Sequence, residues 1–273
     1  MTAFTRHPAG LPVVSTSATR RTRDGMQEDA TTAVADEAPV ALVFNGITHA
    51  VMMASPTDLE AFALGFALSE GIIDSRADWR GADVDAHPHG LEVHAEIATH
   101  CFVRLKARRR ALAGPTGCGL CGIESLQTFE AAPVPLAPPA WVPTLPDALV
   151  LDALKALTAA HQPANALTGG LHAAGWVPAN GNGMPAHVLE DVGRHNALDK
   201  LIGRLTRLGI APADGFVVMT SRASFELVRK CVQTGVPLLA TISAPSSLAI
   251  AHARTGQLTL LAFCRGDSVT RFA

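Results

Sequence analysis

The sequence predicts an α/β protein in which a three-layer C-terminal domain follows a smaller α+β N-terminal domain. First, strand-like and helix-like segments alternate from residue 147 onward, which is typical of a domain with a largely parallel sheet. Second, six prolines between residues 133 and 146 favour a stiff, extended connector. Third, residues 40–97 contain a hairpin-like segment, a helical segment and an alternating strand. We therefore divide the chain into a flexible tail (1–30), an N-terminal domain (31–131), a linker (132–146) and an α/β domain (147–273).

The composition excludes several classes of protein. The chain has 273 residues, of which 48% are hydrophobic, and a formal net charge of −2. This is ample material for a core, and so small a charge fits neither a disordered chain nor a protein that binds nucleic acid or an anionic membrane over a large surface. No stretch approaches the ~18 apolar residues of a membrane helix. Five cysteines do not make a disulfide-rich secreted scaffold, and we expect a cytoplasmic protein with reduced thiols.

The N-terminal elements follow from local patterns. Residues 1–30 lack hydrophobic periodicity, so regular structure is expected to begin near Pro39. Residues 40–54 predict a β-hairpin, because Asn45 and Gly46 suit a type I′ turn between two apolar runs. Ser55 and Pro56 predict the N-cap and the first position of a helix. One apolar face of that helix is expected to contain Leu59, Phe62, Ala63, Phe66 and Ala67. Residues 91–97 alternate between apolar and polar and predict a half-buried strand.

The C-terminal domain is expected to place its polar loops at one edge of the sheet. Helices are expected over residues 147–160, 196–208, 225–234 and 246–253. Strands are expected over residues 187–191, 215–220, 236–242 and 258–263. Ligands of such sheets bind beyond the carboxyl ends of the strands. One cleft is therefore predicted to be lined by the loops at residues 190–195, 220–222, 243–247 and 264–268.

Cys118 and Cys121 form a C-x-x-C motif framed by glycines at 114, 117, 119 and 122. A helix is predicted over residues 123–129, and a helix N-terminus stabilises a thiolate and so raises its reactivity. A structural zinc site needs four ligands, and Cys101, Cys231 and Cys264 offer no second close pair. A thioredoxin-like redox pair normally sits in a βαβ unit, which the surrounding pattern does not predict. The glycines favour a third possibility, a sulfur carrier in which one thiolate holds a persulfide.

Two alternatives belong to other classes of function. A zinc-dependent, deaminase-like hydrolase has the pattern H-x-E…P-C-x-x-C, which His94, Glu96, Pro115 and the two cysteines match in part. However, His94 and Glu96 fall on the polar face of a predicted strand, and Pro115 lies three residues before the first cysteine. No permanent metal is therefore predicted. A non-catalytic maturation chaperone is the other alternative, and it would tolerate the loss of both cysteines.

Seven segments together resemble the formate dehydrogenase accessory sulfurtransferase family, FdhD. The most specific of them is EDVGRHNALDK at residues 190–200. The others are ALGFALSEGII (63–73), GCGLCG (117–122), TGGLHAA (168–174), SRASFEL (221–227), ISAPSSL (242–248) and FCRG (263–266). They occur in order across residues 39–266, so the resemblance covers nearly all of the chain except its first 38 residues.

The resemblance implies a sulfurtransferase that accepts sulfur from a cysteine desulfurase and inserts it into the bis-molybdopterin guanine dinucleotide cofactor of molybdenum. The catalytic subunit of formate dehydrogenase would then receive the modified cofactor. The resemblance also implies a homodimer and a cytidine-deaminase-like C-terminal fold without the zinc site. Cys118 corresponds to the cysteine that carries the persulfide, and Cys121 to its partner, which relays sulfur or protects the first thiol. The cofactor-binding stretch of the family corresponds to Phe263, Cys264, Arg265, Gly266, Asp267 and Ser268.

Basic residues in the predicted loops are candidates for contacts with the phosphate or guanine groups of such a GDP-like ligand. The guanidinium groups of Arg194, Arg222 and Arg265 match phosphate geometry. His172 and His195 are candidates for moving protons or lining the cofactor site, or else for fixing the loops. Glu190 and Asp191 have the alternative of structural hydrogen bonds at a strand end.

Overall fold

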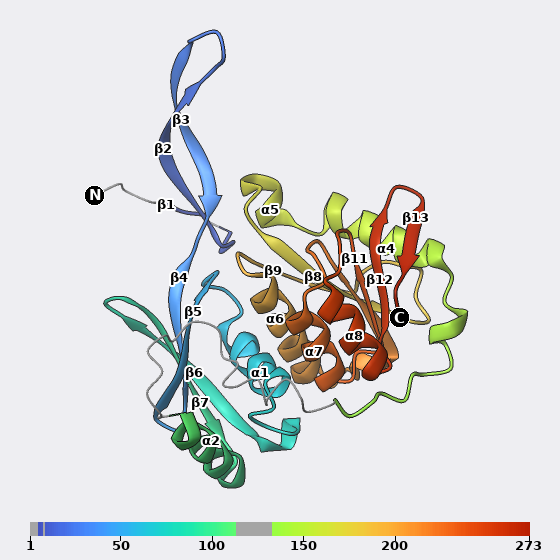
Figure 1. Ribbon diagram of the computed structural model, residues 1–273. Helices are drawn as coiled ribbons and strands as arrows, with labels where there is room; N and C mark the ends of the chain where they lie inside the picture. Colours follow the sequence, from blue (N-terminus) through green and yellow to red (C-terminus); the bar gives the residue numbers. More distant parts are fainter. Residues whose placement is uncertain (1–4, 8, 113–132) are drawn as a thin grey trace.

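The computed structural model describes residues 5–7, 9–112 and 133–273, which form three β-sheets and the helices that pack on them (Figure 1). The strand orders are β1-β2-β3, β5-β4-β7-β6 and β13-β12-β11-β10-β8-β9. The first sheet is a ribbon that extends away from the two larger ones. No helix among the described residues is long and apolar enough to cross a membrane.

The ribbon corrects the expectation that regular structure begins near Pro39. It consists of β1 (Thr5–Arg6), β2 (Val13–Arg21) and β3 (Gln27–Ala35), with β2 and β3 antiparallel along their whole length. Residues 17–32 are exposed on both faces. The paired backbone groups hold such a ribbon together, so its sequence needs no hydrophobic alternation and gives no signal. Only its base is packed, where Val13 joins a small apolar cluster with Ala164 and Leu171.

The second sheet contains the predicted hairpin, β4 (Ala38–Phe44) and β5 (Ile47–Ala54). Asn45 and Gly46 have the positive φ angles, 45° and 78°, that a type I′ turn requires. The predicted alternating strand is β7 (Gly90–Ile97), which lies parallel to β4 and antiparallel to β6 (Trp79–His87). The 3-10 helix η1 (Arg76–Asp78) precedes β6, and α2 (Thr99–Leu112) follows β7.

Helix α1 (Leu59–Ser69) is buried on nearly all sides, not along one face as the sequence predicts. One side packs on the second sheet, and the other packs against α6 (Arg194–Leu208) of the C-terminal part. A helix whose residues are apolar on every side is typically buried on every side, as α1 is here. Its N-cap is Asp58 and not the expected Ser55. Ser55 is occupied elsewhere, because its N–H donates to Asp191 and its hydroxyl accepts from the Val192 N–H.

The third sheet has helices on both faces, as predicted. Its strands are β8 (His172–Pro178), β9 (His187–Asp191), β10 (Gly215–Met219), β11 (Leu238–Thr241), β12 (Thr259–Arg265) and β13 (Ser268–Arg271). α4 (Asp147–Ala160) covers one face. The other face is covered by α6, α7 (Phe225–Gln233) and α8 (Ser247–Thr255). The short helix α5 (Pro163–Thr168) precedes β8, while the 3-10 helices η2 (Val142–Thr144) and η3 (Pro212–Asp214) lie in connections.

The expectation of a largely parallel sheet is wrong. Only two pairs, β10 with β11 and β11 with β12, are parallel, whereas β8 pairs antiparallel with both β9 and β10, and β13 with β12. No strand is predicted at β8, because its first four residues, from His172 to Gly175, are not alternately apolar and polar and include no β-branched residue. The space is narrow there: a Cβ on Gly175 would lie 3.1 Å from the side chain of Val218. The strand therefore needs a small residue at Gly175 in order to pack closely against its neighbours.

The two halves of the chain meet where α1 crosses α6. A Cβ on Gly65 would lie 1.8 Å from the carbonyl oxygen of Asp199, and one on Gly203 would lie 1.9 Å from that of Ala61. The two helix backbones therefore touch at a pair of glycines. This contact sets the position of the N-terminal half relative to the first turn of α6, where several predicted site residues lie.

Candidate functional site

Strand direction brings the predicted site residues to one edge of the third sheet. Strands β9 to β12 all end at this edge, and β8 begins there, because β8 is antiparallel to both of its neighbours. Helices α6, α7 and α8 start directly after β9, β10 and β11. The N-termini of three helices therefore point toward this edge, and their helix dipoles favour anions there. We call it the carboxyl edge.

Three arginines add positive charge to the carboxyl edge. Arg194 is the first residue of α6, Arg222 is exposed in the loop between β10 and α7, and Arg265 is exposed at the end of β12. Among the described residues, the arginines that form ion pairs are four others: Arg104, Arg204, Arg207 and Arg229. The Nε of Arg194 is buried and has no hydrogen-bond partner. These guanidinium groups are therefore available to an anionic ligand.

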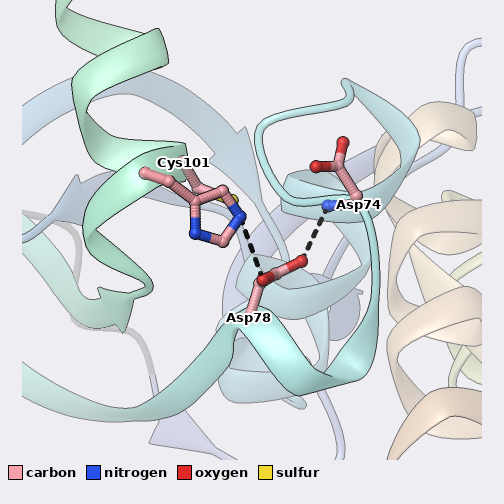
Figure 2. A group of neighbouring side chains, drawn as sticks. Asp74, Asp78 and Cys101 are labelled. Carbon is pink, nitrogen blue, oxygen red and sulfur yellow. Dashed lines mark hydrogen bonds and ion pairs between the residues drawn. The ribbon is translucent and has the colours of Figure 1, made fainter.

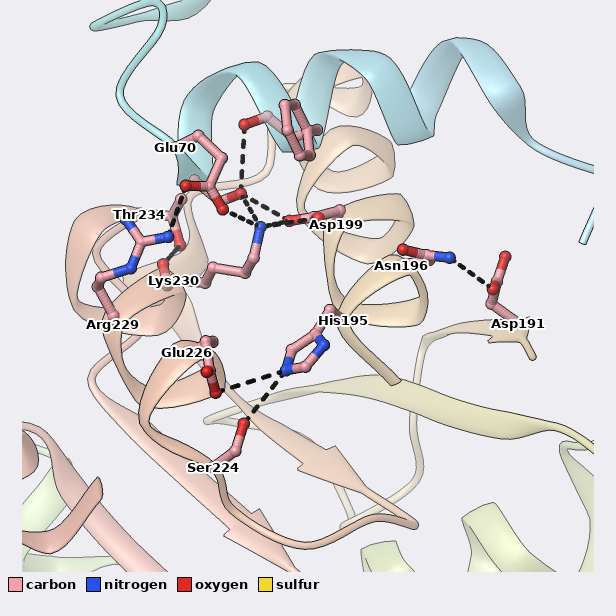
Figure 3. A network of polar contacts seen from close by, with 12 residues as sticks. Glu70, Asp191, His195, Asn196, Asp199, Ser224, Glu226, Arg229, Lys230 and Thr234 are labelled. Carbon is pink, nitrogen blue, oxygen red and sulfur yellow. Dashed lines mark hydrogen bonds and ion pairs between the residues drawn. The ribbon is translucent and has the colours of Figure 1, made fainter. Parts of the chain in front are cut away.

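The two predicted histidines lie beside these arginines as neutral imidazoles. Burial, reinforced by the charge of Arg194, lowers the pKa of His172. Burial lowers the pKa of His195 to about 4, with Arg194 and Lys230 acting in the same direction against Glu226. Nε2 of His195 lies 3.2 Å from the Ser224 hydroxyl (Figure 3). At neutral pH the ring therefore offers one donor and one acceptor without adding charge.

The FCRG segment is turned by an irregular strand end. Phe263 has a left-handed φ of 52°, which is rare for a bulky residue, at the register shift between Ala262 and Arg265. Its N–H donates to the Ser243 carbonyl, which joins two loops of the carboxyl edge. The guanidinium of Arg265 lies 5.9 Å from the Phe263 ring. Gly266, Asp267 and Ser268 are exposed in the turn that follows.

Cys264, which the sequence places among the cofactor-binding residues, does not present its side chain to the carboxyl edge. It is 1% exposed and packs in the core between α4 and the sheet. Burial raises the pKa of its thiol to about 11. Leu261, three residues earlier, packs in the same cluster, so the irregular backbone at Phe263, and not regular strand alternation, turns the Cys264 thiol toward α4. Cys264 therefore acts as a small apolar residue.

Glu190 and Asp191 have the structural role that the sequence analysis left open. Both oxygens of Glu190 accept from N–H groups at the start of α5. Asp191 is fully buried, and its Oδ2 lies 2.6 Å from Nζ of the equally buried Lys200. Lys200 Nζ also donates to the Ser55 carbonyl. These contacts connect the end of β5 to the loop before α6, and so hold Arg194 and His195 in place.

A second buried network was not predicted. Lys230 Nζ lies 2.9 Å from Asp199 Oδ2 and 2.7 Å from Glu70 Oε1, so it joins α7, α6 and α1 (Figure 3). Burial raises the pKa of Glu70, but Lys230 and Arg229 outweigh it and hold the pKa at about 2. The sequence holds one signal for this network, because Asp199 and Lys230 interrupt the apolar faces of predicted helices. Ser224 and Glu226 beside His195 were also missed, although both lie within the matched segment 221–227.

Other predicted residues lie elsewhere. Cys118 and Cys121 fall outside the described residues. His94 is on β7, with Nε2 3.0 Å from Glu92 Oε2 and 3.7 Å from Asp85 Oδ2. Glu96 is exposed on the same strand. The alternation on β7 places His94 and Glu96 on the face opposite the buried Val93 and Ala95, as predicted.

Comparisons with known proteins agree with the resemblance seen in the sequence. The model of the FdhD/NarQ family matches residues 35–273. A protein of Chromobacterium violaceum named sulfur carrier protein FdhD is 54% identical over 91% of this chain and 91% of its own. A protein of the same name from Bordetella parapertussis is 52% identical over 88% and 85%. The fold resembles a crystal structure from Desulfotalea psychrophila described as a formate dehydrogenase accessory protein (TM-score 0.71, 24% identity, 95% and 96% coverage).

Proposed function

Because the chain belongs to the FdhD/NarQ family, we propose that it is a sulfur carrier that serves formate dehydrogenase. Two relatives at 52–54% identity carry the name sulfur carrier protein, and the Cys118–Cys121 motif supplies the thiols that such a role needs. The observation that carries the proposal is the carboxyl edge, where three helix N-termini meet Arg194, Arg222 and Arg265, none of which forms an ion pair within the described part of the chain. That edge suits the phosphates of a nucleotide-bearing cofactor.

In the proposed reaction, the Cys118 thiolate attacks the terminal sulfur of a persulfide on a cysteine desulfurase. A sulfur–sulfur bond forms on Cys118, the bond to the donor breaks, and the donor leaves as a thiolate, so no external oxidant or reductant is needed. Cys121 relays the sulfur or protects the first thiol. Bis-molybdopterin guanine dinucleotide is the proposed acceptor, and the catalytic subunit of formate dehydrogenase is the client. The proposal includes a cytoplasmic location, a homodimer and a cytidine-deaminase-like fold of the third sheet and its helices.

The carrier step has a direct test. Cys118→Ala is expected to abolish transfer of labelled sulfur from a cysteine desulfurase and to leave formate dehydrogenase inactive, because no thiolate remains to accept the sulfur. Intact-protein mass after desulfurase treatment detects the added sulfur. Cys264→Ala is the matched control, since that thiol is buried in the core and is expected to leave sulfur transfer unchanged. Full sulfur uptake by Cys118→Ala would exclude the proposed role of this residue.

Docking at the carboxyl edge is tested with GDP as the probe. Arg222→Ala is expected to weaken GDP binding about tenfold in calorimetry, the effect of losing one charge-assisted contact of about 1.5 kcal/mol. The control is Arg254→Ala, which removes an exposed arginine at the opposite end of α8. Equal GDP affinity in both variants would place the nucleotide elsewhere.

A further inference from the structure

Four metal-ligating side chains gather in the N-terminal half, far along the chain from the arginines of the carboxyl edge. Asp74 and Asp78 lie just before and at the end of η1, while His100 and Cys101 lie in the first turn of α2. One ligand atom from each lies within 4.8 Å of all the others. Figure 2 shows Asp74, Asp78 and Cys101 close together, with the Asp78 carboxylate accepting from the Asp74 N–H. The donors are one nitrogen, one sulfur and two carboxylates.

The distances within this cluster suit a tetrahedral cation. His100 Nε2 lies 3.3 Å from Asp78 Oδ1 and 3.3 Å from Cys101 Sγ. Bonds of about 2.0 Å to nitrogen and oxygen and about 2.3 Å to sulfur, at tetrahedral angles, place neighbouring ligand atoms about 3.3–3.6 Å apart. The imidazole therefore already stands at ligand spacing from two of its three partners.

The surroundings hold both carboxylates in position. Asp78 Oδ2 accepts from the N–H groups of Asp74 and Ser75, so that Oδ1 is the oxygen facing His100. Arg104 donates to both oxygens of Asp74, each at 2.9 Å. A carboxylate oxygen has a second lone pair for a cation while it accepts from arginine. Such outer hydrogen bonds are typical of the partners that orient metal ligands.

We propose that Asp74, Asp78, His100 and Cys101 form a binding site for one zinc-like divalent cation. The thiolate and imidazole select a borderline ion such as Zn²⁺ over Mg²⁺ or Ca²⁺, which prefer oxygen ligands alone. On binding, the Cys101 S–H bond breaks, the sulfur–metal bond forms and one proton passes to solvent. The cation fastens η1 to the start of α2, the helix that leads along the chain to Cys118.

The test uses Co²⁺ as an optical probe in a Cys118→Ser/Cys121→Ser background, since those two thiols are themselves metal ligands. We expect one equivalent of Co²⁺ to bind with a thiolate-to-cobalt charge-transfer band. Cys101→Ser is expected to remove that band, whereas the matched control Cys264→Ser is expected to keep it. Zn²⁺ is expected to displace the Co²⁺ and to raise the melting temperature.

A second variant keeps the test valid if Cys101→Ser does not fold. The His100 side chain is 64% exposed, so His100→Gln is expected to fold normally and to bind Co²⁺ about tenfold or more weakly. Absence of the charge-transfer band in the double-serine background, or Co²⁺ affinity unchanged in His100→Gln, would overturn the proposal and leave the cluster as ion pairs only. Sulfur uptake by Cys118 is measured by mass in a separate experiment, so the failure of one proposal is distinguishable from the failure of the other.

Discussion

Replacement of Lys200 by methionine is expected to lower the free energy of unfolding by about 3–5 kcal/mol. The side chains of Lys200 and Asp191 are both 0% exposed, and their Nζ and Oδ2 atoms lie 2.6 Å apart. Methionine keeps most of the volume but leaves the Asp191 carboxylate buried without a cation and the Ser55 carbonyl without its donor. Urea unfolding of the purified protein at neutral pH measures the loss.

Two further variants separate the buried charge from the lost side chain. Lys200→Met combined with Asp191→Asn is expected to recover part of the stability, because no net charge is then buried. Lys155→Met, at an exposed position on α4, is expected to change stability by less than about 0.5 kcal/mol. If Lys200→Met lowers the free energy of unfolding no more than Lys155→Met does, the ion pair between β9 and α6 makes no net contribution to stability.

Gly203→Ala is expected to lower the free energy of unfolding by about 3 kcal/mol or more, the upper range for overpacking. At an exposed helical position the same change gains up to about 1 kcal/mol from helix propensity. Here the new Cβ would lie 1.9 Å from the Ala61 carbonyl oxygen, so α1 and α6 must move apart. Because both partners at this contact are backbone, no side-chain rotation relieves the clash.

The matched control is Gly170→Ala, where the new Cβ would lie 3.5 Å from the Ala35 side chain, an ordinary contact. Its melting temperature is expected to stay near that of the original protein. Should Gly203→Ala be too unstable to purify, its soluble fraction on expression beside that of Gly170→Ala gives the comparison. Equal stability of the two variants would show that the helices separate at little cost.

Local patterns predicted most of the regular elements. The hairpin at Asn45, the helix Asp147–Ala160 and the strand His187–Asp191 lie where the sequence analysis places them. The periodicity of apolar residues and the identity of turn residues are local properties, so they can be recognised in short stretches of sequence. Neither strand β8 nor the ribbon β2–β3 has such a pattern, because β8 begins with four residues that show no alternation and most of the ribbon is exposed on both faces.

The alternation of strands and helices also predicted that polar loops meet at one sheet edge, which brings Arg194, Arg222 and Arg265 there. It did not separate Phe263 and Arg265 from the inward-facing Cys264 between them. That distinction depends on the strand register and on which face α4 covers, and both are set by packing. The reactivity of Cys118 and Cys121 stays a prediction from their spacing and their glycines, since both residues lie outside the described part of the chain.

The sequence by itself therefore determined the family and the edge of the sheet that carries the basic residues, and it predicts a sulfur-carrier role for the C-x-x-C motif. Only the tertiary structure decided that Ser55 binds Asp191, that Gly65 and Gly203 let α1 touch α6, and that His100 stands beside Asp78. The physical reason is the separation along the chain between the residues that interact. Backbone preference and periodicity are encoded in neighbouring residues, whereas a buried polar network or a helix crossing joins residues that are as many as 161 positions apart.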